Sequence, residues 1–357
     1  MAALYREFEI DLDEVGIDDA ILTTDHAIHK HIKQLIVVHR LMPFRKDPNY
    51  EVRWSEKLRL LLERLPRDKL ESVCTPRSTE LSQALLDLMF SRQRNLKYIQ
   101  LGPGHKLQNI SVPQLPRLEA LEIPAHIGPL ENLRFYQTLL SQNRNIKGLS
   151  VRAQHYDVRP GHTLPVDRGV EQPSNVFPRI FGHRPLELKR LLLCTQKLFD
   201  AETTLTPYIP FERLHELHFL DCDGIGQMLS LLGNRFKSTG SALQLLSLHA
   251  YTSNVVSNLD MAALEGFLES FKGLRFLEIR WDDIIRPDFH IRCLEGHMPT
   301  LTDLNLSFMK DEHRHKWFMN QHDVEKLFQM APNLRQVALP LRDVNPYGRR
   351  GLSAVLD

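Results

Sequence analysis

The chain has 357 residues, and its 45 lysines and arginines nearly balance its 44 aspartates and glutamates, which gives a formal net charge of +1. This balance argues against a dedicated binder of nucleic acids or anionic membranes, because such proteins need a concentrated basic surface. A charged fraction of 25% and a hydrophobic fraction of 42% exclude a largely disordered chain. The sequence contains no unbroken apolar run near 18 residues, so we expect no membrane span.

The four cysteines lie far apart and form no CxxC pair. A chain of this length can build a core without disulfides, so free thiols in a reducing compartment are expected. The opening MAALYREFEIDLDEVG is acidic where a secretory signal would be basic and then apolar. We therefore expect a cytoplasmic or nuclear location.

One short pattern recurs along the chain: an aliphatic residue, two variable residues, a second aliphatic, one variable residue and a third aliphatic. It occurs first as HIKQLIV and last as NLRQVAL, and its copies begin 22 to 42 residues apart. The end of the pattern alternates as a strand requires, because neighbouring side chains of a strand point to opposite faces. We call the first aliphatic residue of each copy its anchor. The anchors are Ile32, Leu70, Leu96, Leu118, Ile146, Leu188, Leu214, Leu243, Leu274, Leu301 and Leu334.

Segments with helical spacing lie between these strands. VRWSEKLRLLLERL (Val52 to Leu65) carries its apolar residues on one helical face. Pro129 favours the first turn of a second helix, and Asp260 is expected to cap the helix DMAALEGFLESF. Another helix should end before Pro332. Repeated strand–turn–helix units predict a solenoid, in which each unit buries its apolar stripe against its neighbours.

These copies resemble the leucine-rich-repeat family. The resemblance implies an α/β leucine-rich-repeat solenoid, with a curved parallel sheet on the concave side and helices on the convex side. The copy RLHELHFLDCDGI is similar to the cysteine-containing subclass, with Cys222 at the cysteine position. Other copies depart from that subclass, because Tyr251, Asp282 and Met309 occupy the place.

The domain organisation expected is a capping segment over residues 1–31 followed by the solenoid over residues 32–357. Phe8, Ile10 and Leu12 alternate near the start and predict an extra edge strand beside the first copy. An insertion over residues 153–185, rich in Pro, Gly, His and Arg, has no periodicity. A loop of that length is typically either functional or disordered, and both alternatives stay open.

The opening, a Leu4–Tyr5–Arg6 step followed by a short strand, resembles the segment after the F-box in fungal F-box/leucine-rich-repeat proteins. No F-box motif is visible in the chain. The resemblance implies the substrate-recognition region of a receptor for a cullin-RING (SCF) ubiquitin ligase, acting in ubiquitin-dependent protein degradation. A Skp-type adaptor and a cullin are expected as partners only if an F-box exists upstream. The alternative is a leucine-rich-repeat binding protein unconnected to ubiquitination.

No catalytic motif is present, so we expect no enzymatic activity, no cofactor and no bound metal. Gly224 follows a predicted strand, but Leu229 stands where a dinucleotide-binding loop needs glycine or alanine. HELH at 215–218 is one residue short of HExxH. Four residues at irregular spacing offer only a weak zinc site: Cys293, His297, His313 and His315.

The variable positions of a leucine-rich-repeat solenoid project from its concave strands, where they are free to contact a protein target. We expect the chain to bind its target there as a monomer outside any complex, without nucleic-acid or membrane partners. In the copy ALQLLSL, Leu246 is expected to be buried and Ser247 to project. Trp281 is either a binding residue or part of the core. The candidate contact residues are Glu216, His218, His249, Phe276, Glu278, Arg280, Trp281, Asp303 and Asn305.

Overall fold

The computed structural model describes residues 7–11, 29–38, 50–75, 81–102, 107, 114–124, 130–152, 180–181, 185–239, 244–284, 289–308, 319 and 321–339. It is a mixed α/β structure of parallel strands connected by helices. The chain divides into two compact units, which are described in turn: residues 1–196 with 203–210, and residues 197–202 with 211–357. Nearly all of the insertion predicted over residues 153–185 lies outside the described residues.

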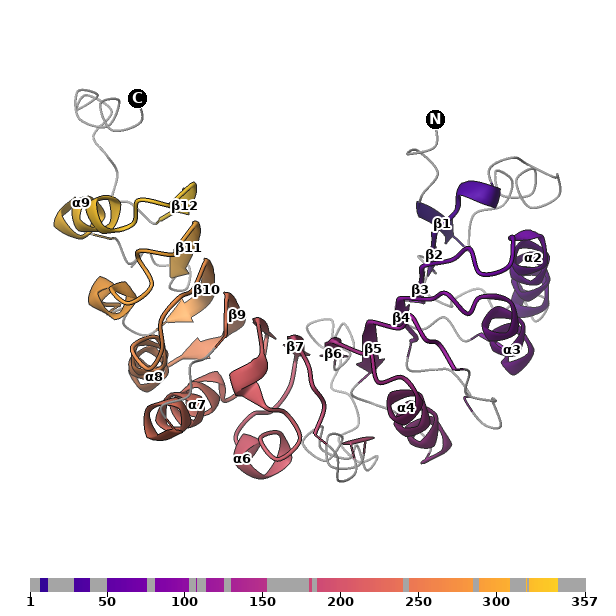
Figure 1. Ribbon diagram of the computed structural model, residues 1–357, viewed down its shortest axis with the longest axis horizontal. Coiled ribbons are helices and arrows are strands. Elements are labelled where there is room, and N and C mark those ends of the chain that lie inside the picture. Colours follow the sequence, from indigo (N-terminus) through magenta and orange to yellow (C-terminus); the bar gives the residue numbers. More distant parts are fainter. Residues whose placement is uncertain are drawn as a thin grey trace, which may run out of the picture. The chain divides into compact units, whose positions relative to one another are not determined.

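In the first unit, each strand pairs in parallel with the next strand along the chain (Figure 1). The described α-helices that follow the second, third and fifth strands lie on one face of these strands. The edge strand predicted near the start is present and pairs with the strand at residues 34–38. The strands are β1 (Glu7–Asp11), β2 (Gln34–Val38), β3 (Ser72–Cys74), β4 (Tyr98–Gln100), β5 (Ala120–Pro124), β6 (Gly148–Arg152) and β7 (Arg190–Cys194). The helices are α2 (Tyr50–Arg64), α3 (Gln83–Arg92) and α4 (Leu130–Gln142), with a 3-10 turn η1 (His29–His31).

The second unit repeats this plan, with parallel strands in chain order and helices on one face (Figure 1). Its strands are β8 (Glu216–Leu220), β9 (Ser247–Val256), β10 (Phe276–Ile284), β11 (Asp303–Phe308) and β12 (Gln336–Ala338). Its helices are α7 (Ile225–Thr239), α8 (Asn258–Leu268) and α9 (Gln321–Met330), with 3-10 turns η3 (Phe211–Arg213) and η4 (Ile291–Leu294). The one-turn α6 (Ala201–Thr204) precedes them.

The anchors lie in the core. All six anchors of the first unit are at most 5% exposed, and in the second unit Leu214, Leu274 and Leu301 are at most 1% exposed. Burying a leucine side chain contributes about 1.5–3 kcal/mol relative to leaving it in water. The last anchor differs, because Leu334 is only half-buried and Val337 of β12 is 37% exposed.

The residue after the anchor makes the same backbone bond at nine positions in the described part of the chain. Its carbonyl accepts two N–H groups from the next strand, as Lys33 does from Glu71 (2.6 Å) and Ser72 (3.1 Å). This shared acceptor marks equivalent positions in different copies. The carbonyls that accept in this way in the described residues are those of Lys33, Glu71, Lys97, Glu119, Lys147, His215, Leu246, Arg275 and Thr302.

The expected register of the copy ALQLLSL was wrong by two residues. Leu246 belongs to the series of shared acceptors and is 36% exposed, whereas Leu245 is 2% exposed and takes the anchor position. The anchor expected at 243 lies outside the described residues. A shift of two leaves the strand alternation unchanged, so Leu248 still points inward. The pattern fits Leu243, Leu246 and Leu248, and it also fits Leu245, Leu248 and Ala250. Only the backbone pairing distinguishes these two registers.

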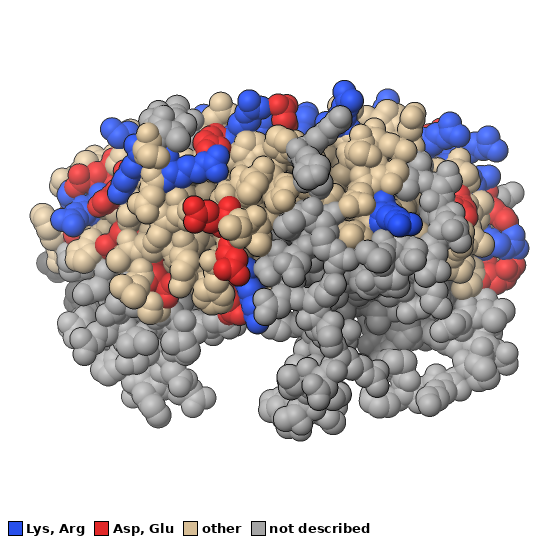
Figure 2. Space-filling model, turned by 90° about the horizontal axis from the view of Figure 1, so that it is seen from below, with Lys and Arg blue, Asp and Glu red and all other residues tan. Residues whose placement is uncertain are grey.

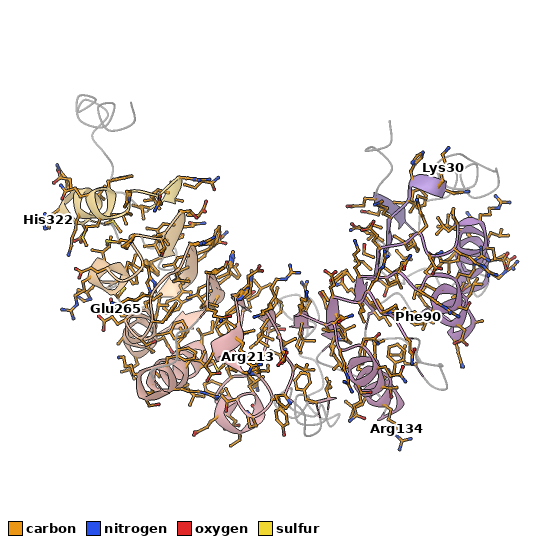
Figure 3. All side chains as sticks on the ribbon, in the orientation of Figure 1. Lys30, Phe90, Arg134, Arg213, Glu265 and His322 are labelled. Atoms are coloured by element: carbon orange, nitrogen blue, oxygen red, sulfur yellow. The ribbon has the colours of Figure 1, made fainter. Side chains whose placement is uncertain are left out.

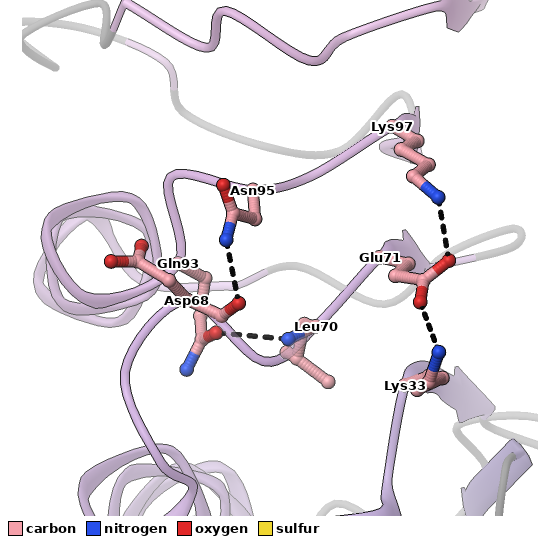
Figure 4. A network of polar contacts seen from close by, with 7 residues as sticks. All are labelled: Lys33, Asp68, Leu70, Glu71, Gln93, Asn95 and Lys97. Atoms are coloured by element: carbon pink, nitrogen blue, oxygen red, sulfur yellow. Dashed lines mark hydrogen bonds and ion pairs between the residues drawn. The ribbon is translucent and has the colours of Figure 1, made fainter.

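Polar side chains at the helix ends join neighbouring copies (Figure 4). Gln93 accepts from Leu70 N at 3.0 Å, and the Asn95 amide donates to Asp68 O at 2.9 Å. Equivalent asparagine bonds join Asn145 to Pro116 O at 2.8 Å and Asn333 to Pro299 O at 2.7 Å. These bonds satisfy carbonyls and amides in the turns between helix and strand.

Figure 4 also shows a charged contact across three strands. Glu71 lies between Lys33, at 2.5 Å, and Lys97, at 2.9 Å. The hydrogen bonds from the two lysines lower the pKa of Glu71 to about 2. The carboxylate therefore stays charged throughout the neutral and mildly acidic range.

The start of α8 corrects the expected cap. Ser257 is the N-cap, and its side chain accepts from Asp260 N. Asp260 instead lies in the first turn and accepts from Ser257 N at 2.9 Å, which completes a capping box. Serine and aspartate are both good N-cap residues, so residue type alone could not decide between Ser257 and Asp260.

The corrected register predicts unequal effects of two neighbouring substitutions. Leu245→Ala should lower the free energy of unfolding of the second unit by about 2–5 kcal/mol, because it leaves a cavity in the core. Leu246→Ala should cost about 1 kcal/mol or less, because that side chain is partly in water. Urea denaturation of both variants measures the difference. Equal costs would show that the register is wrong.

Candidate functional site

The register of the second unit aligns the predicted contact residues in three rows across β8 to β11. The leucines between the rows are buried, so the row residues lie on the sheet face opposite the helices (Figures 1 and 3). We call these rows the polar ladder. The first row is Glu216, Ser247, Phe276 and Asp303; the second is His218, His249, Glu278 and Asn305; the third is Leu220, Tyr251, Arg280 and Ser307.

His249 is bonded through both nitrogens of its ring. Its Nδ1 lies 2.9 Å from Glu278 Oε2, and its Nε2 lies 2.9 Å from Ser247 Oγ. The Asn305 amide donates to the other oxygen of Glu278 at 2.9 Å. Because an ionised carboxylate only accepts hydrogen bonds, Nδ1 donates to Glu278; a neutral ring then accepts from the Ser247 hydroxyl at Nε2. The network thus fixes the tautomer and orientation of His249 and the position of Glu278.

Three rings stack in a column across β8, β9 and β10. The rings of His218 and His249 are 4.0 Å apart and 9° from parallel, and those of His249 and Phe276 are 4.5 Å apart at 24°. Glu216 Oε2 lies 3.9 Å from His218 Nε2. The side chains of His218 and His249 keep 28% and 25% of their surface in water. The column therefore reaches the surface beside carboxylates.

The third row contains a cation–π contact. The guanidinium carbon of Arg280 lies 5.2 Å from the centre of the Tyr251 ring. Arg280 is exposed and Tyr251 is half-buried. Sequence analysis treated Tyr251 only as a departure from the cysteine subclass. Its place in the register, opposite Arg280, gives it a role on the ladder.

Trp281 is a core residue, so the prediction that it contacts a partner was wrong. It is fully buried, and its ring lies 6.3 Å from that of Phe308 in an edge-on arrangement. The cause is strand alternation: Arg280 projects outward, and the next residue must point inward. The side chains of Asp282 and Asp283 are outside the described part of the chain.

A second polar cluster lies on the strands of the first unit, where sequence analysis proposed no contact residues. Glu122 accepts from Gln100 Nε2 at 2.7 Å and from Tyr98 OH at 3.3 Å, and Arg152 Nε lies 3.3 Å from the same carboxylate. Burial raises the pKa of the Tyr98 hydroxyl. The signal was available, because Tyr98, Gln100 and Glu122 occupy variable positions of NLKYIQL and RLEALEI.

The described residues of the weak zinc candidate do not form a metal site. His297 is fully buried; its Nδ1 accepts from Leu274 N at 3.3 Å, and its Nε2 donates to Leu268 O at 2.9 Å. Both ring nitrogens are therefore used by the backbone. His313 and His315 lie outside the described residues. Within the described ranges, no three His, Cys, Asp or Glu side chains are placed to hold a metal ion.

Gly224, which was considered as part of a phosphate loop, and the nearby Gly226 both have a role in packing. Gly224 has a positive φ of 76° at the turn into α7. A side chain at Gly226 would start only 2.0 Å from the Asp260 carboxylate, so glycine permits the close approach of α7 and α8. The four cysteines Cys74, Cys194, Cys222 and Cys293 are buried and form no disulfide.

Charges of both signs are mixed over the described part of the face in Figure 2, which agrees with the small net charge. None of the described helices is both long and apolar enough to cross a membrane.

Comparisons with known proteins identify no family. No protein-family model matches the chain, and no curated protein matches its sequence. A structural-genomics crystal structure of a Bacteroides fragilis protein aligns with 94% of this chain and 76% of its own, at 12% identity and a TM-score of 0.39. A likeness at this level carries no argument about function.

The buried imidazole of His297 predicts a pH-dependent stability. Burial lowers the pKa of His297 to about 4 from its ordinary value of 6.5, so the unfolded chain binds this proton more readily. Stability should therefore fall as the pH falls from about 6.5 towards 4. His297→Gln keeps an acceptor and a donor but does not titrate. Urea unfolding at several pH values should show a shallower decline for the variant, and equal slopes would contradict the prediction.

Proposed function

We propose that the protein is a leucine-rich-repeat interaction scaffold that binds a protein segment on the polar ladder of its second unit. The observation that carries the proposal is the preorganised network around His249. Its rings and carboxylates lie partly exposed on the sheet face opposite the helices, held by bonds between three strands. Little side-chain entropy remains to be lost at such a surface when a partner binds.

The leucine-rich-repeat assignment is supported by equivalent bonds at equivalent positions. The residue before the anchor donates its side-chain amide to the turn of the preceding copy at Asn95, Asn145 and Asn333. The anchors in both units fill the space between strands and helices. Leucine-rich-repeat proteins consist of similar units, and each unit buries the apolar surface of the unit before it.

Acyl transfer at Ser247 is a second candidate, because Ser247, His249 and Glu278 are spaced as a nucleophile, a base and an acid are. Such a site also needs N–H donors aimed at the oxyanion. The Ser247 N–H donates instead to His215 O at 3.0 Å, and the Phe276 N–H donates to Leu246 O at 3.0 Å. Binding is therefore the stronger proposal.

The SCF ubiquitin-ligase assignment stays a prediction that rests on the resemblance of the opening segment. Purification of the tagged protein from its native cell would test it. Recovery of a Skp-type adaptor and a cullin would support the assignment, whereas an unrelated set of proteins would support the alternative without a ligase.

A double substitution tests the proposed binding face. Glu278→Ala with Arg280→Ala should leave the fold intact, since neither side chain is in the core, and should weaken capture of the native partner at least about tenfold. The matched control is Lys237→Ala with Glu269→Ala, which removes the same two charges from exposed positions at the ends of α7 and α8. The readout is the amount of each partner recovered on affinity beads. Full binding by the folded ladder variant would place the site elsewhere.

The acyl-transfer candidate has its own test. We expect no labelling of Ser247 by a fluorophosphonate probe, since the N–H groups of Ser247 and Phe276 already donate to carbonyl oxygens. Mass spectrometry of the treated protein measures the adduct. Labelling of Ser247 that is lost in His249→Ala would instead favour an enzyme.

A further inference from the structure

We propose that the polar ladder recognises a basic segment of its partner by binding an arginine side chain against Phe276. The inference rests on the proposed protein-binding function and names the chemistry of the partner. It draws on three features of the ladder: its charge, its stacked rings and its own internal cation–π contact.

The charge of the polar ladder favours a cationic partner. Its described side chains hold three carboxylates, Glu216, Glu278 and Asp303, against the single guanidinium of Arg280. A complementary potential speeds association and disfavours partners of the same sign. The excess of carboxylates would repel an acidic segment and attract a basic one, so the ladder selects a basic segment.

The rings favour arginine over lysine. Phe276 stacks on His249 with one face, and its neighbour in the first row on the other side is Asp303. A guanidinium is planar and carries five N–H donors, so it can stack on a ring while it donates to carboxylates beside that ring. The ammonium group of lysine is compact and strongly hydrated, and it stacks less well.

The carboxylates are held in place for this contact. Each oxygen of Glu278 accepts one bond, from His249 and from Asn305, and an ionised carboxylate offers about four acceptor sites. The Thr302 hydroxyl lies 2.6 Å from Asp303 Oδ2 and 2.9 Å from Arg275 O, and its one proton is shared between these two acceptors. Glu278 and Asp303 therefore retain lone pairs for a ligand without needing to rearrange.

The protein already contains one example of the contact. Arg280 lies over Tyr251 two rows away from Phe276, on the same sheet face. A guanidinium above an aromatic ring of these strands is thus compatible with their spacing. The proposed ligand repeats that arrangement from a second chain.

The test uses a random peptide phage library screened against the full chain. Selected peptides are then synthesised with each arginine replaced by citrulline, which keeps the planar shape without the charge, or by lysine, which keeps the charge without the plane. We expect an arginine to recur at one position. Citrulline there should weaken binding at least about tenfold, and lysine should weaken it about threefold or more.

Variants of the protein locate the contact. Glu278→Gln and Asp303→Asn preserve shape and should reduce the arginine-to-citrulline difference towards unity, whereas Glu269→Gln on the helix side should leave it unchanged. Phe276→Ala should abolish the preference for arginine over lysine, with thermal unfolding used to confirm the fold.

Two other results would overturn the proposal: one refutes only the recognition of arginine, and the other also refutes the proposed binding function. Peptides that require Phe276 but bind citrulline as well as arginine would refute arginine recognition while leaving the polar ladder as a binding face. Peptides that ignore Phe276, or a screen that yields none, would refute both the arginine site and the proposed function.

Discussion

The polar ladder depends on one backbone constraint, the carbonyl after each anchor that accepts two N–H groups from the next strand. In the second unit, Leu246 O accepts from Arg275 and Phe276, and Arg275 O accepts from Thr302 and Asp303. This bond fixes the register, and the register decides which side chains become neighbours. His249 and Glu278 are 29 residues apart in the chain, yet they are hydrogen-bonded because their strands cannot slide without losing the buried anchors.

Much of the fold could be predicted because the buried residues are apolar and recur at regular spacings in the sequence. Ile32, Leu70 and Leu96 are buried as their pattern requires, and the helices between strands follow from helical spacing. The pattern failed where it was degenerate. Leu245 and Leu246 fit it equally well, and only the pairing of strands distinguishes them. Trp281 shows the same limit, since residue type suggested a contact and strand alternation placed it in the core.

The candidate site was predictable as a set of residues but not as an arrangement. Its side chains were found as the variable positions of the pattern. Their contacts could not be derived, because the stacking of His218 on His249 and the bond of Asn305 to Glu278 depend on rotamers and on the spacing of three strands. In the same way, sequence composition cannot show that the His297 ring serves two backbone groups, Leu274 N and Leu268 O, rather than a metal.

The hydrogen bonds around His249 limit the kind of partner that can bind to the polar ladder. The bonds of Ser247, His249, Glu278 and Asn305 are made without a ligand, so a partner gains little by breaking them. It gains by adding to them, through lone pairs that the carboxylates still hold and through aromatic side chains that are partly exposed. A ligand that only donates hydrogen bonds and is itself planar meets both conditions. Among the side chains of proteins, the guanidinium of arginine combines these properties with a permanent positive charge.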